Sequence, residues 1–150
     1  MTKKTKVLAS GCFDPLHYGH LRYLEEAKKL GGANSELIVV IARDSTIQKF
    51  KGRSPIIPEE QRRALVEALK PVDKSILGRE GVDIPAILRE VRPDIIAIGY
   101  DQNNLAEKVK EAAAKEGLNI RVVKLDKYCD LSSSAILERL KEIVIKQRKT

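Results

Sequence analysis

The sequence has no tryptophan and only two cysteines and two histidines among its 150 residues. Two cysteines cannot form the disulfide framework of a small secreted protein. No apolar run approaches the roughly 20 residues that a membrane-spanning helix needs. The N-terminus leads straight into a short strand-like run rather than a signal peptide. We therefore expect a cytoplasmic protein without a membrane partner.

Aromatic residues make up only 4% of the chain, and the net charge at neutral pH is +7. A nucleic-acid-binding surface is one explanation for a basic chain, but here the lysines and arginines are scattered among 21 acidic residues. An anionic small-molecule substrate explains the charge equally well. We expect such a substrate and no nucleic-acid partner.

Short apolar segments rich in branched residues alternate with amphipathic stretches of helical period. Strands are predicted over residues 6–10, 36–42, 75–77, 95–98 and 120–123, and helices over 21–30, 58–69, 84–91, 105–116 and from 132 onward. Repeated β-α units favour a parallel sheet with right-handed crossovers. The pattern predicts one α/β domain over residues 1–150, a Rossmann-like parallel five-stranded sheet with helices on both faces, and a solvated tail over 146–150.

Three of these helices have an apolar face, and that of the first helix consists of Leu21, Leu24, Ala27 and Leu30. The face of the second helix consists of Ala64, Leu65, Ala68 and Leu69. That of the last helix consists of Ile136, Leu137, Leu140, Ile143 and Val144.

Both histidines lie in one stretch directly after the first predicted strand, Gly11-Cys12-Phe13-Asp14-Pro15-Leu16-His17-Tyr18-Gly19-His20. They are three residues apart, so both rings can project from the same side of a helix start. A helix start presents unpaired N–H groups and the positive end of a dipole, which suit phosphate. The stretch therefore predicts a phosphate-binding site, although two surface histidines remain the simpler alternative.

Other ligand chemistries have weaker signals in the sequence. Neither a Walker A sequence nor G-x-G-x-x-G is present, which excludes the usual kinase and dinucleotide-binding loops. Two sulfur and two nitrogen ligands for zinc could come from Cys12, His17, His20 and Cys129, but these cysteines lack the paired spacing of a zinc knuckle.

The pattern G-x-F-D-x-x-H-x-G-H resembles the signature of the nucleotidylyltransferase (cytidylyltransferase-like) superfamily. In that family the histidines bind the nucleotide triphosphate and stabilise the transition state as pyrophosphate leaves. The resemblance implies that His17 and His20 are catalytic. It also implies that nucleotide-binding residues include Cys12, Phe13, Asp14, Tyr18 and Gly19.

Further matches follow in the order of the family. Lys49, with Lys51 nearby, resembles a lysine over the phosphates, and Arg62 resembles the arginine that supports the phosphate site; both are implied to be catalytic. Asp101 follows the fourth predicted strand, like the nucleotide-bordering G-x-D segment. Ser132 and Ser133 resemble a serine/threonine segment that forms a second phosphate-binding helix end. The alternative for the two lysines is a solvated charge pair, and for Asp101 it is a plain turn. The serines can also be an ordinary helix cap, and we expect both roles at once.

Nearly the whole chain resembles the archaeal FAD synthases, through residues 41–63 and 66–74, Asp101-Gln102 and a cysteine just before the serine cluster. This resemblance implies transfer of AMP from ATP to FMN, with Mg²⁺ bound together with the nucleotide and no residue assigned as a metal ligand. Homodimers are common in the superfamily.

A second resemblance concerns the acceptor: residues 11–14 and 21–28 also resemble the nucleotidyl-transfer domain of ADP-heptose synthesis. A sugar-phosphate or glycerol-phosphate acceptor therefore stays open. Residues 127–134 lack the arginine and glycine that cytidylyltransferases usually carry there, which argues against CTP. Tyr128 is our expected neighbour of the nucleotide instead.

The two cysteines flank the expected site. Cys12 ends the first predicted strand and Cys129 precedes the last helix. We expect them to lie close enough to the site for thiol oxidation or alkylation to impair activity.

Overall fold

The computed structural model describes residues 3–102 and 104–149. Five parallel strands form one sheet in the order β3-β2-β1-β4-β5. They are β1 Thr5–Gly11, β2 Ser35–Ile41, β3 Lys74–Leu77, β4 Ile95–Ile98 and β5 Arg121–Lys124. The predicted five-stranded parallel α/β fold is confirmed, and no strand boundary differs from its prediction by more than one residue.

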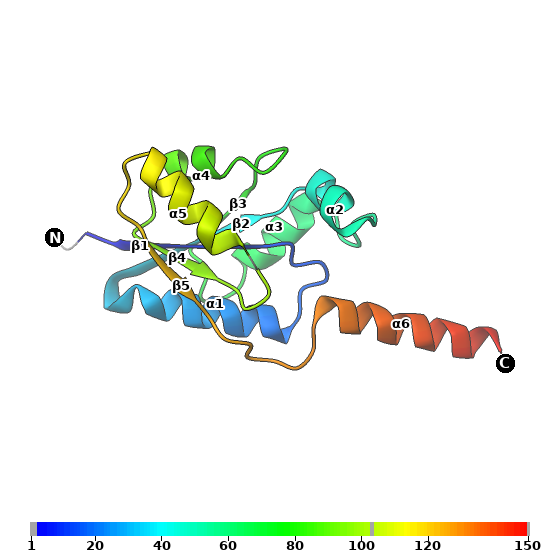
Figure 1. Cartoon of the computed structure of the whole chain (residues 1–150). Coiled ribbons are helices and arrows are strands. Elements are labelled where there is room, and N and C mark those ends of the chain that lie inside the picture. The colour runs from blue at the N-terminus through cyan, green and yellow to red at the C-terminus, as the bar shows by residue number, and fades with distance from the viewer. Residues whose placement is uncertain (1–2, 103, 150) are drawn as a thin grey trace.

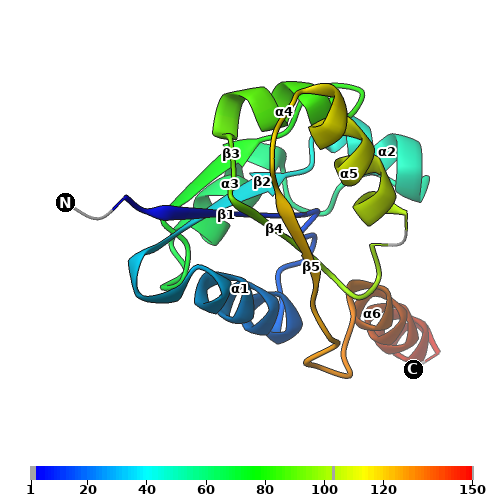
Figure 2. The same ribbon diagram turned by 60° about the vertical axis from the view of Figure 1, so that its left-hand side comes forward.

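Helices cover both faces of the sheet (Figures 1 and 2). On one face α1 (Tyr18–Leu30) and α3 (Glu59–Glu67) pack on Val7, Ala9 and Val39. On the other, α4 (Ile84–Val91) and α5 (Leu105–Lys115) pack on Leu8 and Ile38. This division follows from the alternation of side chains along each strand.

The strand order reverses between β1 and β4, which lie side by side at the middle of the sheet. The chain after β1 enters α1 on one face, whereas the chain after β4 enters α5 on the other. The two connections thus diverge at the carboxyl ends of these strands and leave a crevice there. Ligands of open α/β sheets bind at such a switch point.

The remaining helices are a short 3₁₀ turn η1 (Gly32–Asn34), α2 (Asp44–Lys51) and α6 (Ser133–Arg148). No helix was predicted for α2. In α3 the predicted inward face is wrong: the helix ends at Glu67, Leu65 is exposed, and Arg62 and Val66 are the buried residues. The buried arginine is Arg62, which the resemblance had linked to the phosphate site.

The apolar face predicted for the last helix, α6, is not buried against the domain. The helix projects away from the domain (Figure 1), and none of its residues is buried. It continues through Arg148, so most of the predicted tail is helical, although exposed to solvent; Thr150 lies outside the described residues. Across residues 3–102 and 104–149, no helix is long and apolar enough to cross a membrane.

Candidate active site

A cavity of about 310 Å³ lies at the carboxyl ends of β1 and β4, beside the first residues of α1 and α6. We call it the histidine pocket. Nine predicted site residues line it: Cys12, Phe13, His17, Gly19, His20, Asp101, Tyr128, Ser132 and Ser133. Three segments far apart in the sequence are thus brought together as predicted.

The two histidines cap α1 with their own ring nitrogens. Nδ1 of His17 accepts a hydrogen bond from the N–H of Gly19, and Nδ1 of His20 accepts one from the N–H of His17, both at 3.1 Å. A neutral imidazole that accepts at Nδ1 carries its proton on Nε2. The rings stack with their centroids 3.8 Å apart. The pair therefore offers two adjacent Nε2–H donors to a ligand in the pocket.

Burial lowers the pKa of His20 to about 3, with further lowering by the neighbouring His17 and Lys51. Burial also lowers the pKa of His17, against the opposing effect of Asp101. Protonation of either ring would place a hydrogen on Nδ1 and break the helix cap. Near neutral pH His20 is therefore a neutral donor, and positive charge in the pocket must come from other groups.

Gly19 is required where the ring of His17 folds back over the helix start. A Cβ atom at this position would lie 2.9 Å from Cε1 of His17 and 3.1 Å from Cβ of Cys129. The same closeness shows that Cys129 lies against the beginning of α1. Cys12 and Cys129 are both free thiols that line the histidine pocket. The effect of their alkylation on activity stays a prediction.

Lys51, rather than Lys49, lines the histidine pocket. The Nζ atom of Lys49 instead lies over the ring of Phe50, 5.5 Å from its centroid. Residues two apart on a helix point in nearly opposite directions, and the sequence pattern did not reveal α2. The catalytic role of Lys49 stays a prediction, and Lys51 is the cation that the geometry supplies.

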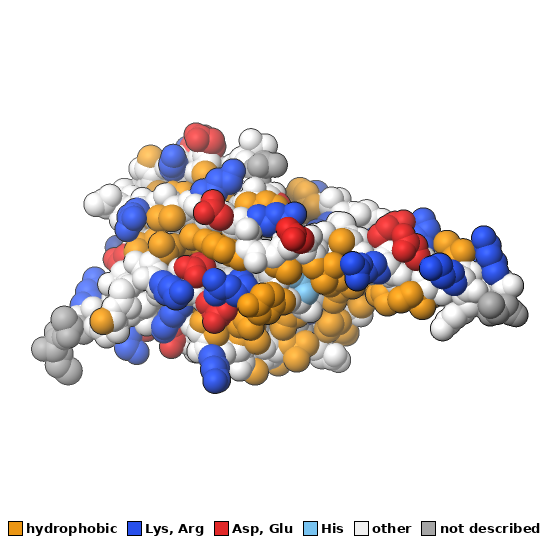
Figure 3. Space-filling view, turned by 90° about the horizontal axis from the view of Figure 1, so that it is seen from below, with side chains coloured by type: hydrophobic (Ala, Val, Ile, Leu, Met, Phe, Trp, Pro, Cys, Tyr) orange, Lys and Arg blue, Asp and Glu red, His pale blue; other side chains and the backbone are white. Residues whose placement is uncertain are grey.

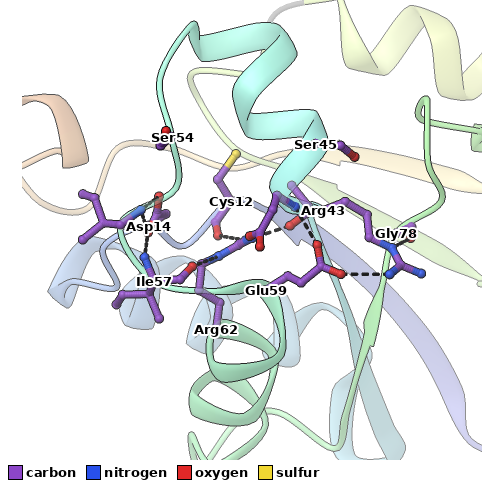
Figure 4. Close-up of polar contacts among 12 residues, drawn as sticks. Cys12, Asp14, Arg43, Ser45, Ser54, Ile57, Glu59, Arg62 and Gly78 are labelled. Atoms are coloured by element: carbon purple, nitrogen blue, oxygen red, sulfur yellow. Dashed lines mark hydrogen bonds and ion pairs between the residues drawn. The ribbon is translucent and has the colours of Figure 1, made fainter.

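Arg62 lies beneath the pocket and is only 1% exposed. Its Nη1 donates to the carbonyls of Cys12 and Ala42 at 2.8 and 2.7 Å (Figure 4). Its Nε donates to the carbonyl of Ile57 at 2.7 Å, and its Nη2 pairs with Asp44 at 2.7 Å. This guanidinium ties the ends of β1 and β2 to the first residue of α2 and to the segment before α3. Its nitrogens are engaged by the protein, which supports a positioning role, and the catalytic role of Arg62 stays a prediction.

Asp14 likewise supports the pocket without lining it. Its buried carboxylate accepts hydrogen bonds from Arg53 at 2.8 Å and from the N–H groups of Ile56 and Ile57, each at 2.9 Å. Burial alone would raise the pKa of Asp14. The hydrogen bonds together outweigh this effect, so the pKa lies below its usual value. Tyr18 is exposed and does not line the pocket either. Direct nucleotide contact by these two residues has no support in the geometry.

Phe13 lines the histidine pocket and packs against His20. Its buried ring meets the ring of His20 edge-on, with the centroids 5.0 Å apart. The residue has a φ of 52°, a left-handed conformation that is rare without a constraining environment. The turn after β1 is therefore held by packing as well as by Asp14.

The opposite wall contains Gln102, which belongs to a resemblance stated from the sequence but was not assigned to the site, and the predicted Ser132. Gln102 accepts from the N–H of Gly99 at 2.7 Å and donates to the carbonyl of Ser10 at 3.2 Å, which joins the ends of β4 and β1. Ser132 caps α6 by accepting from the N–H of Ala135 at 3.1 Å. Other lining residues outside the predicted set are Gly11, Tyr23, Tyr100, Asp126, Leu131 and Ser134. The resemblance through Asp101-Gln102 was the available signal for Gln102, whereas Tyr23 and Asp126 reach the pocket through tertiary structure.

The zinc alternative has no geometric support. In the part of the chain that the structure describes, no group of three or more His, Cys, Asp or Glu side chains is arranged to hold a metal ion.

The N-termini of α1 and α6 face one cavity, at the point where the strand order of the sheet reverses. This arrangement defines a class of protein, the nucleotide-binding α/β domains, and it suits phosphate groups. Sequence comparison narrows this class. The chain belongs to the cytidylyltransferase-like family, whose model matches residues 8–139.

Similar proteins cover most of the chain. It is 49% identical over 144 residues to an FAD synthase from Archaeoglobus profundus, which spans 93% of this chain and 88% of that protein. It is 45% identical over 141 residues to an FAD synthase from Methanopyrus kandleri, covering 92% of this chain and 93% of that one. The resemblance stated from the sequence is confirmed.

A solved structure from Thermoplasma volcanium, described as a lipopolysaccharide core biosynthesis protein, has the same fold with a TM-score of 0.77. It is 45% identical and covers 85% of this chain and 100% of that one. The descriptions of these similar proteins therefore differ, with FAD synthase for two of them and lipopolysaccharide core biosynthesis for the third.

Proposed function

We propose that the protein is an FMN adenylyltransferase, which transfers AMP from ATP to FMN and releases pyrophosphate, giving FAD. The observation that carries this proposal is the reciprocal cap of His17 and His20, because it fixes two neutral Nε2–H donors beside a phosphate-binding helix start. The FAD synthases among the relatives support ATP and FMN as the substrates.

The nucleophile is a phosphate oxygen of FMN. It attacks the α-phosphorus of ATP, the bond from this phosphorus to the oxygen bridging the β-phosphate breaks, and pyrophosphate leaves with the electron pair. The attacking phosphate is already ionised at neutral pH, so the reaction needs no general base. Alignment and charge stabilisation supply the catalysis.

The lining residues suit these tasks. His17 and His20 donate to phosphate oxygens, and Lys51 adds a positive charge near them. The start of α6, capped by Ser132, offers a second set of unpaired N–H groups to the nucleotide. Arg62 and Asp14 hold the turn that carries the histidines.

We include Mg²⁺ bound with the nucleotide in this proposal. Mg²⁺ is usually held by one or two carboxylates together with substrate phosphates, and Asp101 and Asp126 are the carboxylates that line the histidine pocket. When bound there, the ion would neutralise charge on the triphosphate.

A sugar phosphate is the second candidate acceptor, because the Thermoplasma volcanium protein is described by lipopolysaccharide core biosynthesis. Incubation with ATP or CTP and each of FMN, heptose 1-phosphate, glycerol 3-phosphate and phosphopantetheine, with products identified by mass spectrometry, separates the candidates. We expect a product, FAD, only from the combination of ATP with FMN, and none from the other combinations. A product with heptose 1-phosphate and none with FMN would overturn the FMN assignment.

His17→Asn provides the matched variant for this assay. Asparagine is a good helix N-cap, so the variant keeps the cap while it loses the Nε2–H donor. We expect turnover to fall by about 100-fold or more, the usual effect of removing one transition-state donor, with an unchanged circular dichroism spectrum. Near-normal turnover would show that the histidine pair is not the catalytic centre.

We also propose a homodimer that works in the cytoplasm. The apolar stripe of α6 (Ile136, Leu137, Leu140, Ile143 and Val144) has no buried residue, and Figure 3 shows hydrophobic side chains along this projecting helix. A second copy of α6 would cover the stripe. Two free cysteines suit a reducing compartment.

A further inference from the structure

A second cavity of about 470 Å³ opens on the other face of the sheet from α1. We call it the apolar pocket. Its floor is formed by Leu8, Val40 and Ile96 of the sheet, and its walls come from α2, α4, α5 and the connection between β3 and α4. The size lies within the usual range for small-molecule sites, roughly 300–1,000 Å³.

The walls of this pocket continue the hydrophobic core. Ile87 and Leu88 of α4 and Val109 of α5 line it, and all three belong to the buried cluster on this face. An apolar hollow next to the core leaves carbon surface uncovered, which is unfavourable in water. A ligand with a large apolar face would cover that surface.

Most of the charged side chains that line the pocket already have partners. Arg43 pairs with Glu59 at 2.9 Å and donates to the carbonyl of Gly78 at 2.8 Å. The Asp83 carboxylate accepts from the N–H of Ala86 at 3.1 Å, and Arg79 forms an ion pair with Glu90. Buried sugar hydroxyls would find few partners here, and unpaired buried hydroxyls are costly. The lining therefore suits a flat aromatic ring better than a polyhydroxylated sugar.

The apolar pocket meets the histidine pocket at the carboxyl end of β1. Ser10, Gly11, Cys12 and Gln102 line both cavities. A Cβ atom at Gly11 would lie 3.0 Å from the ring of Phe13, so a side chain there would crowd this strand end, which glycine leaves open. A ligand that fills the apolar pocket can therefore extend a polar chain along this strand end toward the phosphates of ATP.

Two large apolar side chains on the pocket lining are left exposed. Phe50 at the end of α2 is 65% exposed, and Val82 before α4 is 45% exposed. They come from two different segments, and each would lose contact with water if a flat ring lay between the sheet and them. Phe50 also has the aromatic face that ring stacking requires.

We propose that the apolar pocket binds the isoalloxazine ring of FMN. The ribityl chain crosses the end of β1, at Ser10–Cys12, and delivers its phosphate to the α-phosphorus of ATP in the histidine pocket. This inference rests on the proposed FMN acceptor and adds where the ring binds and why a flat aromatic acceptor is favoured over a sugar phosphate. Phe50 is the residue assigned to stack on the ring.

Two substitutions test the assignment with different risks to folding. Thr46→Phe fills the cavity from α2, where Thr46 lines it half-buried. Phe50→Ala removes the stacking side chain at an exposed position. Leu65→Ala is the matched control, since Leu65 is also an exposed large apolar residue, on α3, and lines neither pocket.

Steady-state kinetics with ATP and FMN give the KM of each substrate, and inhibition by riboflavin reports the ring alone, because riboflavin has no phosphate. We expect Phe50→Ala and Thr46→Phe to raise the KM for FMN and the inhibition constant of riboflavin together, by about tenfold. The KM for ATP should stay within about twofold, and Leu65→Ala should match the unsubstituted protein.

The outcomes separate the two proposals. If the unsubstituted protein makes FAD and both pocket variants leave the KM for FMN unchanged, the ring site is wrong and the FMN activity stands. A raised KM for FMN with unchanged riboflavin inhibition would also overturn the ring site, since the phosphate end would then be affected. If the unsubstituted protein makes no FAD, the proposed function fails, and this inference fails with it.

Discussion

At the scale of single residues, the histidine pocket contains neutral hydrogen-bond donors and one lysine from α2. Lys49 and Lys51 differ by two positions, and the structure gives pocket contact to Lys51 only. Lys51 also lowers the pKa of His20, after the effects of burial and of His17, which places its charge near the imidazole pair. A cation there can offset the charge that develops as pyrophosphate leaves.

We therefore predict that Lys51→Ala reduces kcat more than Lys49→Ala does. Loss of an electrostatic contact made in the transition state lowers kcat by about 10- to 100-fold, and we expect that loss for Lys51→Ala. Rates of pyrophosphate release at saturating ATP and FMN measure the difference, and Lys51→Arg should recover part of the activity because the charge is kept. A larger loss in Lys49→Ala would show that α2 turns its other side to the nucleotide.

At the scale of elements, the buried Arg62 donates hydrogen bonds to four segments of the chain. It bonds the ends of β1 and β2 through carbonyls and the beginning of α2 through Asp44. Its planar fork reaches several acceptors at once, which a lysine cannot do.

Replacement by lysine should destabilise these connections and leave buried carbonyls unpaired. We predict that Arg62→Lys lowers the free energy of unfolding by about 2–3 kcal/mol, measured by urea denaturation. Arg63→Lys is the control, because Arg63 pairs on the surface with Glu60 and Glu67, and such pairs contribute at most about 1 kcal/mol. Equal stability of both variants with lost activity in Arg62→Lys alone would favour a direct triphosphate contact instead.

The elements also show what sequence could and could not predict. The strands were placed closely because buried parallel strands are near-continuous apolar runs. Helix α2 was missed since Ile47 is its only buried residue, so its pattern carries little periodic signal. The inward face of α3 was wrong because an arginine whose charge is fully paired can be buried, and that pairing depends on distant carbonyls.

The residues of the candidate site also fall into two groups, those that a local motif could predict and those that it could not. His17, Gly19 and His20 form a local motif, so their spacing alone indicated the phosphate-binding turn. Lys51 and Gln102 reach the pocket through the packing of α2 and through a contact across the sheet. No spacing along the chain encodes such contacts.

At the scale of the whole molecule, α6 is a 16-residue helix that starts at the histidine pocket and then leaves the domain (Figure 1). Its first turn carries the serine cluster of the histidine pocket, whereas its apolar stripe faces solvent, with Leu140 51% exposed. A single copy leaves this stripe uncovered. In the proposed homodimer, the helix pairing would also steady the start of α6 against the nucleotide.

We predict that Leu140→Asp converts a dimer into a monomer. Burying one leucine stabilises by about 2–3 kcal/mol, and a symmetric interface loses this twice, so the dimer should weaken by about a thousandfold or more. Lys141→Asp, one position along the same helix and outside the stripe, introduces the same side chain and should leave the dimer intact. Sedimentation velocity measures the assembly state, and a rise in the KM for ATP confined to Leu140→Asp would show that dimerisation supports the nucleotide wall. A monomeric unsubstituted protein at micromolar concentration would refute the pairing, because the stripe would then be exposed without a partner copy.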